Sequence, residues 1–314
     1  MNDYLLLILG FVFLFVSGHY LIYSSVRIAR RFNISDMVIG ITVVAFGTSA
    51  PELFVSLKAV MAGSADISIS NVVGSNIANI ALVLGFVAVV YPLRVKKQAI
   101  WIDWGVMMLA SLLLYFFSWN NGMLNHWEGI VFLVLLGVYM SWLLYDTRIN
   151  KKSSVETKTE NAEKQMSLFL VVLIFAGSVA GLYFGSDWLV KSAKSIALNF
   201  GISERVVGIT VIAFGTSVPE LATSLLAALK KNTDISIGNI IGSNIFNIFA
   251  ILGITSTVKS LNVNSAFLSW DYLWMAGVAM LLLLMLLPLK NGVINRWKGI
   301  VLVGLYVFYI YQLF

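Results

Sequence analysis

The sequence predicts an all-α integral membrane protein in which ten transmembrane helices form two inverted five-helix repeats. Hydrophobic residues make up 59% of the 314-residue chain and charged residues only 11%. A typical soluble domain is about half apolar and about a quarter charged, so this composition indicates a membrane protein. A single sequence offset also aligns the first half of the chain with the second, which indicates that the fold is a duplication.

Ten apolar stretches approach the length of about 20 residues that a helix needs to cross a bilayer. The predicted spans are residues 3–29, 36–62, 66–91, 101–118, 125–146, 167–198, 204–230, 234–258, 268–288 and 293–313. The first stretch has no basic leader and no small-residue cleavage site after it, so it is predicted to be a retained helix rather than a signal peptide. The second, third, seventh and eighth spans are expected to be broken helices that form the core.

The duplication is clearest in a motif that occurs twice. The sequence GITVVAFGTSAPE covers residues 40–52, and GITVIAFGTSVPE covers residues 208–220, which lie 168 residues further on. The same offset aligns residues 66–79 with residues 234–247. Because each half has an odd number of spans, the second half must enter the membrane from the opposite side. Inverted halves with interrupted helices are typical of secondary transporters that bind their substrate near the midplane.

The charge distribution predicts how the chain is oriented. The predicted domains are residues 1–146 with a first motif region at 40–79, a polar linker at 147–166, and residues 167–314 with a second motif region at 208–247. If the N-terminus is outside, 16 of the 21 basic residues fall on the inner face and 5 on the outer face. The positive-inside rule then places the linker in the cytoplasm and both termini outside. This topology accounts for the net charge of +6, so no nucleic-acid partner is predicted.

Glu52 and Glu220 are the acidic residues that their apolar flanks place in the middle of a span. A charged residue at the bilayer centre costs about 2.5–3.5 kcal/mol on insertion scales, so such an acid indicates a functional site. Pro51 and Pro219 each precede one of these acids, and proline cannot donate a hydrogen bond to the carbonyl four residues before it. The alternatives are a buried ion pair, for which no mid-span Lys or Arg is present, and a kink that serves packing alone.

The residues before each acid offer oxygen atoms, which are the ligands that hard cations prefer. These atoms are carbonyls in residues 45–47 and 213–215 and four side-chain hydroxyls. The hydroxyl-bearing residues are Thr48, Ser49, Thr216 and Ser217.

A second repeated motif, Gly-Ser-Asn-x-x-Asn, adds hydroxyl and amide oxygens. Its Ser and its last Asn are four residues apart and share one helix face. The two pairs are Ser75 with Asn79 and Ser243 with Asn247. Asn76 and Asn244 lie off this face and are interpreted as structural. The alternative interpretation of the whole motif is a set of small polar residues that hold membrane helices together.

The repeated Gly-Thr-Ser-x-Pro-Glu, each followed by Gly-Ser-Asn-x-x-Asn, resembles the alpha repeats of the cation/calcium antiporter superfamily, and most closely the prokaryotic type of its sodium/calcium exchanger branch. The resemblance covers essentially the whole chain. It implies a secondary antiporter of the inner cell membrane that extrudes Ca²⁺ electrogenically in exchange for Na⁺, acts as a monomer in the lipid bilayer, and has neither a cofactor nor an enzymatic activity. The implied ion ligands are Glu52, Glu220, Thr48, Thr216, Ser49, Ser217, Ser75, Ser243, Asn79, Asn247 and the carbonyls of Ala45 and Ala213.

Two other functions stay open from the sequence. A Ca²⁺/H⁺ antiporter of the same superfamily is one, because a glutamate can itself carry a proton. A cation channel is the other, although channels usually repeat around a central pore. Some relatives, including K⁺-dependent ones, have Asp where this chain has Asn247, so coupling to K⁺ is not expected.

Overall fold

The computed structural model describes residues 3–32, 34–63, 65–96, 99–149, 166–200, 215, 217–263, 267–287 and 292–312. Within these residues the chain is almost entirely helical. Seven helices are long and apolar enough to cross a membrane, and a bent pair of helices brings the number to eight. The all-α membrane fold is therefore confirmed, whereas the number of ten spans stays a prediction. Part of the predicted seventh span, residues 204–214, lies outside the described residues, as do residues 150–165 of the linker.

The described elements fall into two halves with the same order. In the first half these are α1 (Asp3–Phe32), α2 (Asp36–Ile39), the π-helical segment η1 (Gly40–Val44), α3 (Ala45–Thr48), α4 (Ala50–Met61), α5 (Ala65–Ile77), η2 (Ala78–Leu84), α6 (Gly85–Val90), β1 (Leu93–Arg94), η3 (Ala99–Asp103), α7 (Trp104–Asn121), β2 (Met123–Leu124) and α8 (His126–Ile149). In the second half they are α9 (Leu168–Asn199), α12 (Val218–Leu229), α13 (Thr233–Phe246), η6 (Asn247–Leu252), α14 (Gly253–Val258), β3 (Leu261–Asn262), η7 (Phe267–Asp271), α15 (Tyr272–Leu286), β4 (Val293–Ile294) and α16 (Arg296–Gln312).

Two long helices form the interior of the protein. One runs through α5, η2 and α6, and the other through α13, η6 and α14. In their most apolar windows, 78% and 89% of the residues are buried, against 33% for α1 and 22% for α9. Each long helix has a π-helical segment at the same place in its half, and such segments are frequent at functional sites.

Contacts between the halves interlock them. Strand β1 pairs with β4, and β2 pairs with β3, so each small sheet takes one strand from each half. Helix α6 packs on α16, and α14 packs on α8. A Cβ atom at Gly299 of α16 would lie 2.5 Å from the carbonyl oxygen of Gly85, and one at Gly129 of α8 would lie 2.8 Å from that of Gly253. Glycine is therefore needed at both helix crossings.

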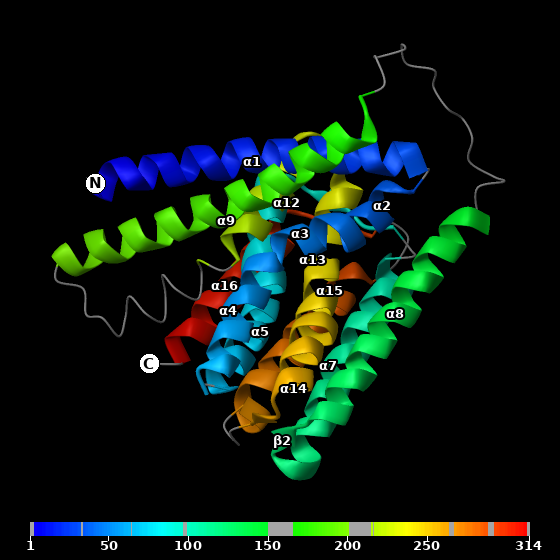
Figure 1. The fold of residues 1–314 in the computed structure, drawn as a ribbon, viewed down its shortest axis with the longest axis vertical. Helices are drawn as coiled ribbons and strands as arrows, with labels where there is room; N and C mark the ends of the chain where they lie inside the picture. The colour runs from blue at the N-terminus through cyan, green and yellow to red at the C-terminus, as the bar shows by residue number, and fades with distance from the viewer. Residues whose placement is uncertain are drawn as a thin grey trace.

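Helices α1 and α9 lie side by side and cross the other helices steeply in Figure 1. The Ser195 hydroxyl donates to Asp3 Oδ2 at 2.6 Å at one end of the pair, and the Arg31 guanidinium donates to the Met166 carbonyl at 3.5 Å at the other. The two helices therefore run antiparallel, although they hold equivalent places in the two halves.

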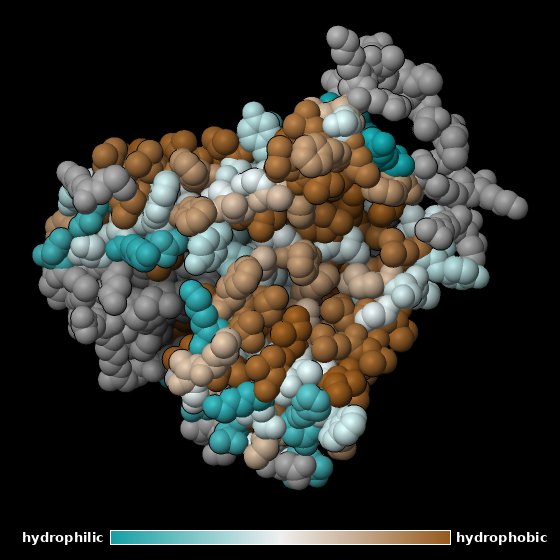
Figure 2. Space-filling model, viewed as in Figure 1, coloured by the Kyte–Doolittle hydropathy of each residue, from teal (hydrophilic) through white to brown (hydrophobic). Residues whose placement is uncertain are grey.

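Apolar side chains cover much of the outer surface. Figure 2 shows hydrophobic residues over the middle of the visible face, with hydrophilic residues gathered toward its ends. Phe11 and Phe15 of α1 are exposed in this way, as are Val134 and Val138 of α8. In water such a surface would be unfavourable, but in a bilayer the lipid chains cover it.

Candidate ion-binding site

The site begins where a helix starts beside each proline. Helix α3 ends at Thr48 and α4 begins at Ala50, and the two helical stretches are bent by 45°. Pro51 lies in the first turn of α4, a position where its missing N–H leaves no intrahelical bond unmade. Glu52 consequently lies in the first turn of α4, and Glu220 holds the same place in α12 after Pro219. The N-terminus of a helix favours negative charge, so the starts of α4 and α12 both suit a carboxylate.

All of the predicted site residues that the structure describes are buried. Their relative exposure is 4% or less, and Glu52 and Glu220 are both at 0%. The residues concerned are Ala45, Thr48, Ser49, Glu52, Ser75, Asn79, Ser217, Glu220, Ser243 and Asn247. Ala213 and Thr216 lie outside the described residues.

Glu220 receives hydrogen bonds from hydroxyls of both halves. Ser49, from the break between α3 and α4, donates to Oε1 of Glu220 at 3.1 Å, and Ser243 of α13 donates to the same atom at 3.5 Å. Thr48 lies 3.5 Å from Ser243, oxygen to oxygen. These polar contacts therefore join the two halves of the chain.

Several buried polar atoms of this region have no hydrogen-bond partner among the described residues. They are both carboxylate oxygens of Glu52, Oε2 of Glu220, both amide atoms of Asn79, Oδ1 of Asn247 and Oγ of Ser217. An unpartnered buried polar group is costly, and a group of them in one place indicates an ion or water site. The ion pairs found in the described part of the chain, Lys96–Asp234 and Lys191–Asp187, involve neither glutamate.

Asn247 is held by a residue that the sequence pattern placed off the site. Its Nδ2 donates to Oδ1 of Asn76 at 3.1 Å, and Nδ2 of Asn76 donates in turn to the backbone carbonyl of Asn244 at 3.3 Å. Through this contact Asn76 uses the Nδ2 of Asn247, whose Oδ1 has no described hydrogen-bond partner. The contact joins the two halves, so helix-face spacing within one half could not reveal it.

Asn239 and Ser224 are further residues that sequence reasoning missed. Thr48 donates its hydroxyl proton to Oδ1 of Asn239 at 3.1 Å, and Nδ2 of Asn239 donates to Ser224 Oγ at 2.9 Å. The offset between the halves pairs Asn239 with Asn71, whose Nδ2 likewise donates to a serine, Ser56, at 3.0 Å. The repetition of this Asn, in residues 66–79 and again in residues 234–247, was the signal in the sequence that could have revealed it.

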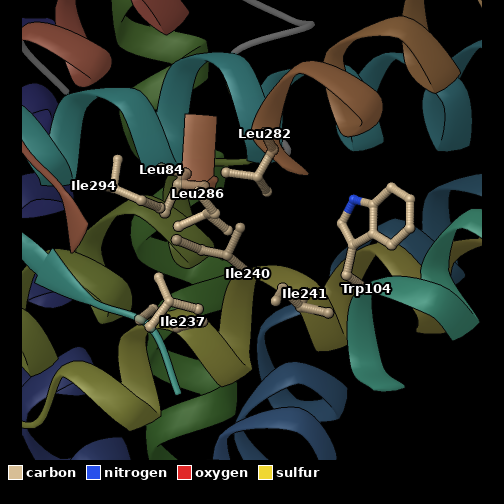
Figure 3. Close-up of a pocket in the computed structure, with 9 residues that line it drawn as sticks. Leu84, Trp104, Ile237, Ile240, Ile241, Leu282, Leu286 and Ile294 are labelled. Atoms are coloured by element: carbon tan, nitrogen blue, oxygen red, sulfur yellow. The ribbon is translucent and has the colours of Figure 1, made fainter. Parts of the chain in front are cut away.

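The chemistry of this site suits a hard cation of low charge. In the described residues no three His, Cys, Asp or Glu side chains come together, so the charge comes from two carboxylates alone. The hydroxyls of Ser49 and Ser243 contact Glu220, and oxygen is the ligand type that Ca²⁺ prefers. The apolar cavity in Figure 3 is a different kind of space, because Leu84, Ile240, Leu282 and its other lining residues carry no carboxylate, hydroxyl or amide side chain.

Fold and site together define a multi-pass membrane protein with a buried, acidic and oxygen-rich centre between its halves. Residues 3–145 and 170–314 match the family described as "sodium/calcium exchanger protein", and the chain belongs to this family.

Individual relatives agree with this assignment. The putative antiporter CaxA of Alkalimonas amylolytica is 37% identical, over 98% of this chain and 97% of its own length. The sodium/calcium exchanger MaX1 of Methanosarcina acetivorans is 31% identical, over 99% of this chain and 98% of its own length. A structure of the sodium-calcium exchanger NCX_Mj, soaked with 10 mM Na⁺ and zero Ca²⁺, matches with a TM-score of 0.82 and 33% identity, over 100% of this chain and 99% of that one. The predicted branch of the superfamily is thus confirmed, and the chain is a transporter that exchanges Ca²⁺ for another cation.

Proposed function

We propose that this protein exchanges Na⁺ for Ca²⁺ across the cell membrane by alternating access. The main support is the pair of fully buried carboxylates, Glu52 and Glu220, with hydroxyl and amide oxygens from both halves around them. The two carboxylates carry a charge of −2, which balances one Ca²⁺. Several Na⁺ ions can replace that Ca²⁺ by sharing the same oxygens in smaller shells.

The proposed ligands are the residues that the two motifs supply. Glu52 and Glu220 provide the charge, and the neutral ligands are Thr48, Ser49, Ser75, Asn79, Thr216, Ser217, Ser243, Asn247 and the carbonyls of Ala45 and Ala213. The unpartnered oxygens of Glu52, Glu220 and Asn247 support this assignment, because a bound cation would satisfy them.

Exchange of three Na⁺ for one Ca²⁺ moves one net charge in each cycle. A membrane potential is worth about 2.3 kcal/mol per elementary charge per 100 mV. An inside-negative membrane would then drive Na⁺ inward and Ca²⁺ outward, so we propose net Ca²⁺ extrusion.

We further propose ten spans in two inverted repeats, with both termini outside and residues 150–165 in the cytoplasm of an inner-membrane protein. The antiparallel course of α1 and α9 supports inversion, since equivalent helices of inverted halves run in opposite directions. The pair packs through small residues, since a Cβ at Gly10 would lie 2.9 Å from the carbonyl oxygen of Gly185. This close packing would let α1 and α9 slide over the core as one unit. Labelling of a cysteine at Ser153 by an impermeant reagent from outside the cell would contradict the orientation.

A flux experiment tests the function. Proteoliposomes that contain the purified protein are loaded with Na⁺, and ⁴⁵Ca²⁺ uptake is measured while an ionophore clamps the membrane voltage. We expect uptake with an outward Na⁺ gradient and none with an outward H⁺ gradient alone. Uptake driven by H⁺ and indifferent to Na⁺ would show a Ca²⁺/H⁺ antiporter instead. Uptake that only equilibrates Ca²⁺ across the membrane, without accumulating it against its gradient, would indicate a channel.

A further inference from the structure

The hydroxyl of Thr48 has one proton and three oxygen atoms within hydrogen-bond reach, of which Ser243 Oγ, at 3.5 Å, is the most distant. Oδ1 of Asn239 lies 3.1 Å from Thr48 Oγ1, and the carbonyl oxygen of Ala45 lies 3.3 Å from it. A hydroxyl can place a lone pair on a cation only if its proton points elsewhere. The acceptor that takes this proton therefore decides which oxygens stay available to an ion.

The side chain of Asn239 is fixed so that its oxygen faces Thr48. Its Nδ2 donates to Ser224 Oγ at 2.9 Å, and both residues are fully buried in neighbouring helices, α13 and α12. Because Nδ2 is used by Ser224, the atom of Asn239 that faces Thr48 is Oδ1, which can only accept.

The carbonyl of Ala45 has only one lone pair to spare. A backbone carbonyl oxygen accepts through two lone pairs, and the N–H of Ser49 occupies one of them at 2.9 Å. If Thr48 donated its proton to Ala45 as well, both lone pairs would be used within the helix. With that proton on Asn239, the carbonyl of Ala45 and the hydroxyl of Thr48 both keep a lone pair for an ion.

We propose that Asn239 is a positioning residue that sets the Na⁺ affinity of the exchanger by taking the proton of Thr48. The inference rests on the proposed function, because it assigns a role within the same ion site. Asn239 does not touch the ion in this proposal. It acts through Thr48 and Ala45, which are two neutral oxygen ligands from one short helix, α3.

The effect falls more on Na⁺ than on Ca²⁺ because the two ions depend differently on neutral oxygens. Ca²⁺ is held mainly by the charges of Glu52 and Glu220, and losing one carbonyl lone pair removes a small part of its binding free energy. When several Na⁺ ions share the same two carboxylates, each relies more on carbonyl and hydroxyl oxygens. Loss of the Ala45 lone pair should therefore weaken Na⁺ binding selectively.

The test compares Asn239→Leu with Asn244→Leu in proteoliposomes. Asn244 lies on the same helix, is equally buried, and donates its amide to the carbonyl of Ile240. Two half-saturation constants are measured: that of Na⁺ for driving Ca²⁺ efflux, and that of Ca²⁺ for ⁴⁵Ca²⁺/Ca²⁺ self-exchange without Na⁺. We expect Asn239→Leu to raise the Na⁺ constant about threefold to tenfold, the range of one hydrogen bond's net contribution, and to leave the Ca²⁺ constant within about twofold. Asn244→Leu should change the ratio of the two constants little.

A double-mutant cycle with Thr48→Val separates positioning from general damage. Without the Thr48 hydroxyl there is no proton to place, so adding Asn239→Leu should raise the Na⁺ constant no further. If Asn239→Leu does not fold, Ser224→Ala removes only the group that holds the amide, and a smaller rise of the Na⁺ constant alone is expected. Equal shifts of both constants, or additive effects of Thr48→Val and Asn239→Leu, would overturn the inference while leaving Na⁺/Ca²⁺ exchange intact. Failure of the proposed function would appear earlier, as a wild-type protein that self-exchanges Ca²⁺ but does not respond to Na⁺, and the inference would fall with it.

Discussion

Glu52 and Glu220 hold equivalent places in the two halves, but their surroundings differ. Oε1 of Glu220 accepts hydrogen bonds from Ser49 and Ser243, whereas neither oxygen of Glu52 has a hydrogen-bond partner among the described residues. Both side chains are fully buried. The difference lies in the hydroxyls around each acid, not in its depth.

The hydroxyl that holds Glu220 most closely comes from the opposite half. Ser49 belongs to the break in the first half, and its counterpart Ser217 directly precedes α12 in the second, where its Oγ has no described partner. A carboxylate held by the other half depends on how the two halves lie relative to each other. A change in that arrangement would therefore change the hydrogen bonds of Glu220.

The largest effect is expected from neutralising either acid. Glu52→Gln and Glu220→Gln each remove half of the negative charge of the site, and losing one partner of a buried charge interaction costs about 2–5 kcal/mol. We expect the rate of Na⁺-driven ⁴⁵Ca²⁺ uptake at subsaturating Ca²⁺ to fall at least about 30-fold in both variants. If only one variant lost transport, the two glutamates would not share one ion.

Asp187→Asn serves as the matched control for these charge changes. Asp187→Asn also removes a carboxylate. In the wild type, however, Asp187 forms an ion pair with Lys191 one turn away on α9 and is partly exposed. An exposed pair of this kind contributes about 0–1 kcal/mol, so transport should stay near that of the wild type. Equal elution volumes in size-exclusion chromatography would show that all three variants are folded.

The next largest effect is expected at the glycine crossings, which the two halves have in common. A Cβ at Gly299 would lie 2.5 Å from the carbonyl oxygen of Gly85, so Gly299→Ala should overpack the contact between α6 and α16. Overpacking typically costs about 1–3 kcal/mol. Gly304→Ala is the control, because it lies on the same helix with nothing within 4 Å of its added Cβ. A lower melting temperature in detergent for Gly299→Ala only would confirm the close crossing, and equal melting temperatures would contradict it.

Asn247 distinguishes the two halves in another way, since its amide is held by Asn76 and that of Asn79 is not held by any described residue. Asn76 presents its oxygen to position 247 because its Nδ2 is used by the carbonyl of Asn244. Asn247→Asp could donate to that oxygen only as a protonated acid. We therefore expect the rate of Ca²⁺ transport by Asn247→Asp to change by a factor of up to about ten between pH 6 and pH 9. The wild-type rate should change by a smaller factor over the same range.

The role of K⁺ at this position is tested in the same proteoliposomes. Exchange by the wild-type protein should be insensitive to K⁺ on both sides, since two carboxylates already balance one Ca²⁺ and Asn247 adds no charge. Asn247→Asp adds a third acid and should recruit a proton or an extra cation. A strict K⁺ requirement in the wild type would show that this position has been misinterpreted.

Much of the fold could be predicted because its signals are local or repeated. Apolar stretches identify most of the helices, and the two prolines mark the places where α4 and α12 begin. The pairing of β1 with β4 and of β2 with β3 could not be predicted, because two-residue strands leave no pattern in the sequence. The ten-span count rests partly on residues outside those described.

The candidate ligands could be predicted from residue type and repetition, whereas the residues that orient them could not. Asn76 contacts Asn247, and Asn239 contacts Thr48, across the boundary between the halves. Helix periodicity relates residues within one helix and carries no information about such contacts. The sequence also could not show the hydrogen bond of the Ala45 carbonyl. This carbonyl accepts the N–H of Ser49, so Pro51 does not leave it without a hydrogen bond.

The smallest expected effect separates Ser49 from Ser217 and tests whether Glu52 and Glu220 are held differently. Ser49→Ala removes a described hydrogen bond to Glu220 at 3.1 Å, whereas Ser217→Ala removes a buried hydroxyl without a described partner. In protein without Ca²⁺ or Na⁺, Ser49→Ala should lower the free energy of unfolding by about 1 kcal/mol, and Ser217→Ala should leave it unchanged or slightly higher. With Ca²⁺ bound, both serines would be ligands, so both variants should raise the Ca²⁺ half-saturation constant by a similar factor of about threefold to tenfold. Melting curves with and without saturating Ca²⁺ measure the first effect, and ⁴⁵Ca²⁺ self-exchange measures the second. Equal destabilisation of both variants in the absence of ions would mean that Glu52 and Glu220 are held alike, and the difference between the halves would then carry no functional meaning.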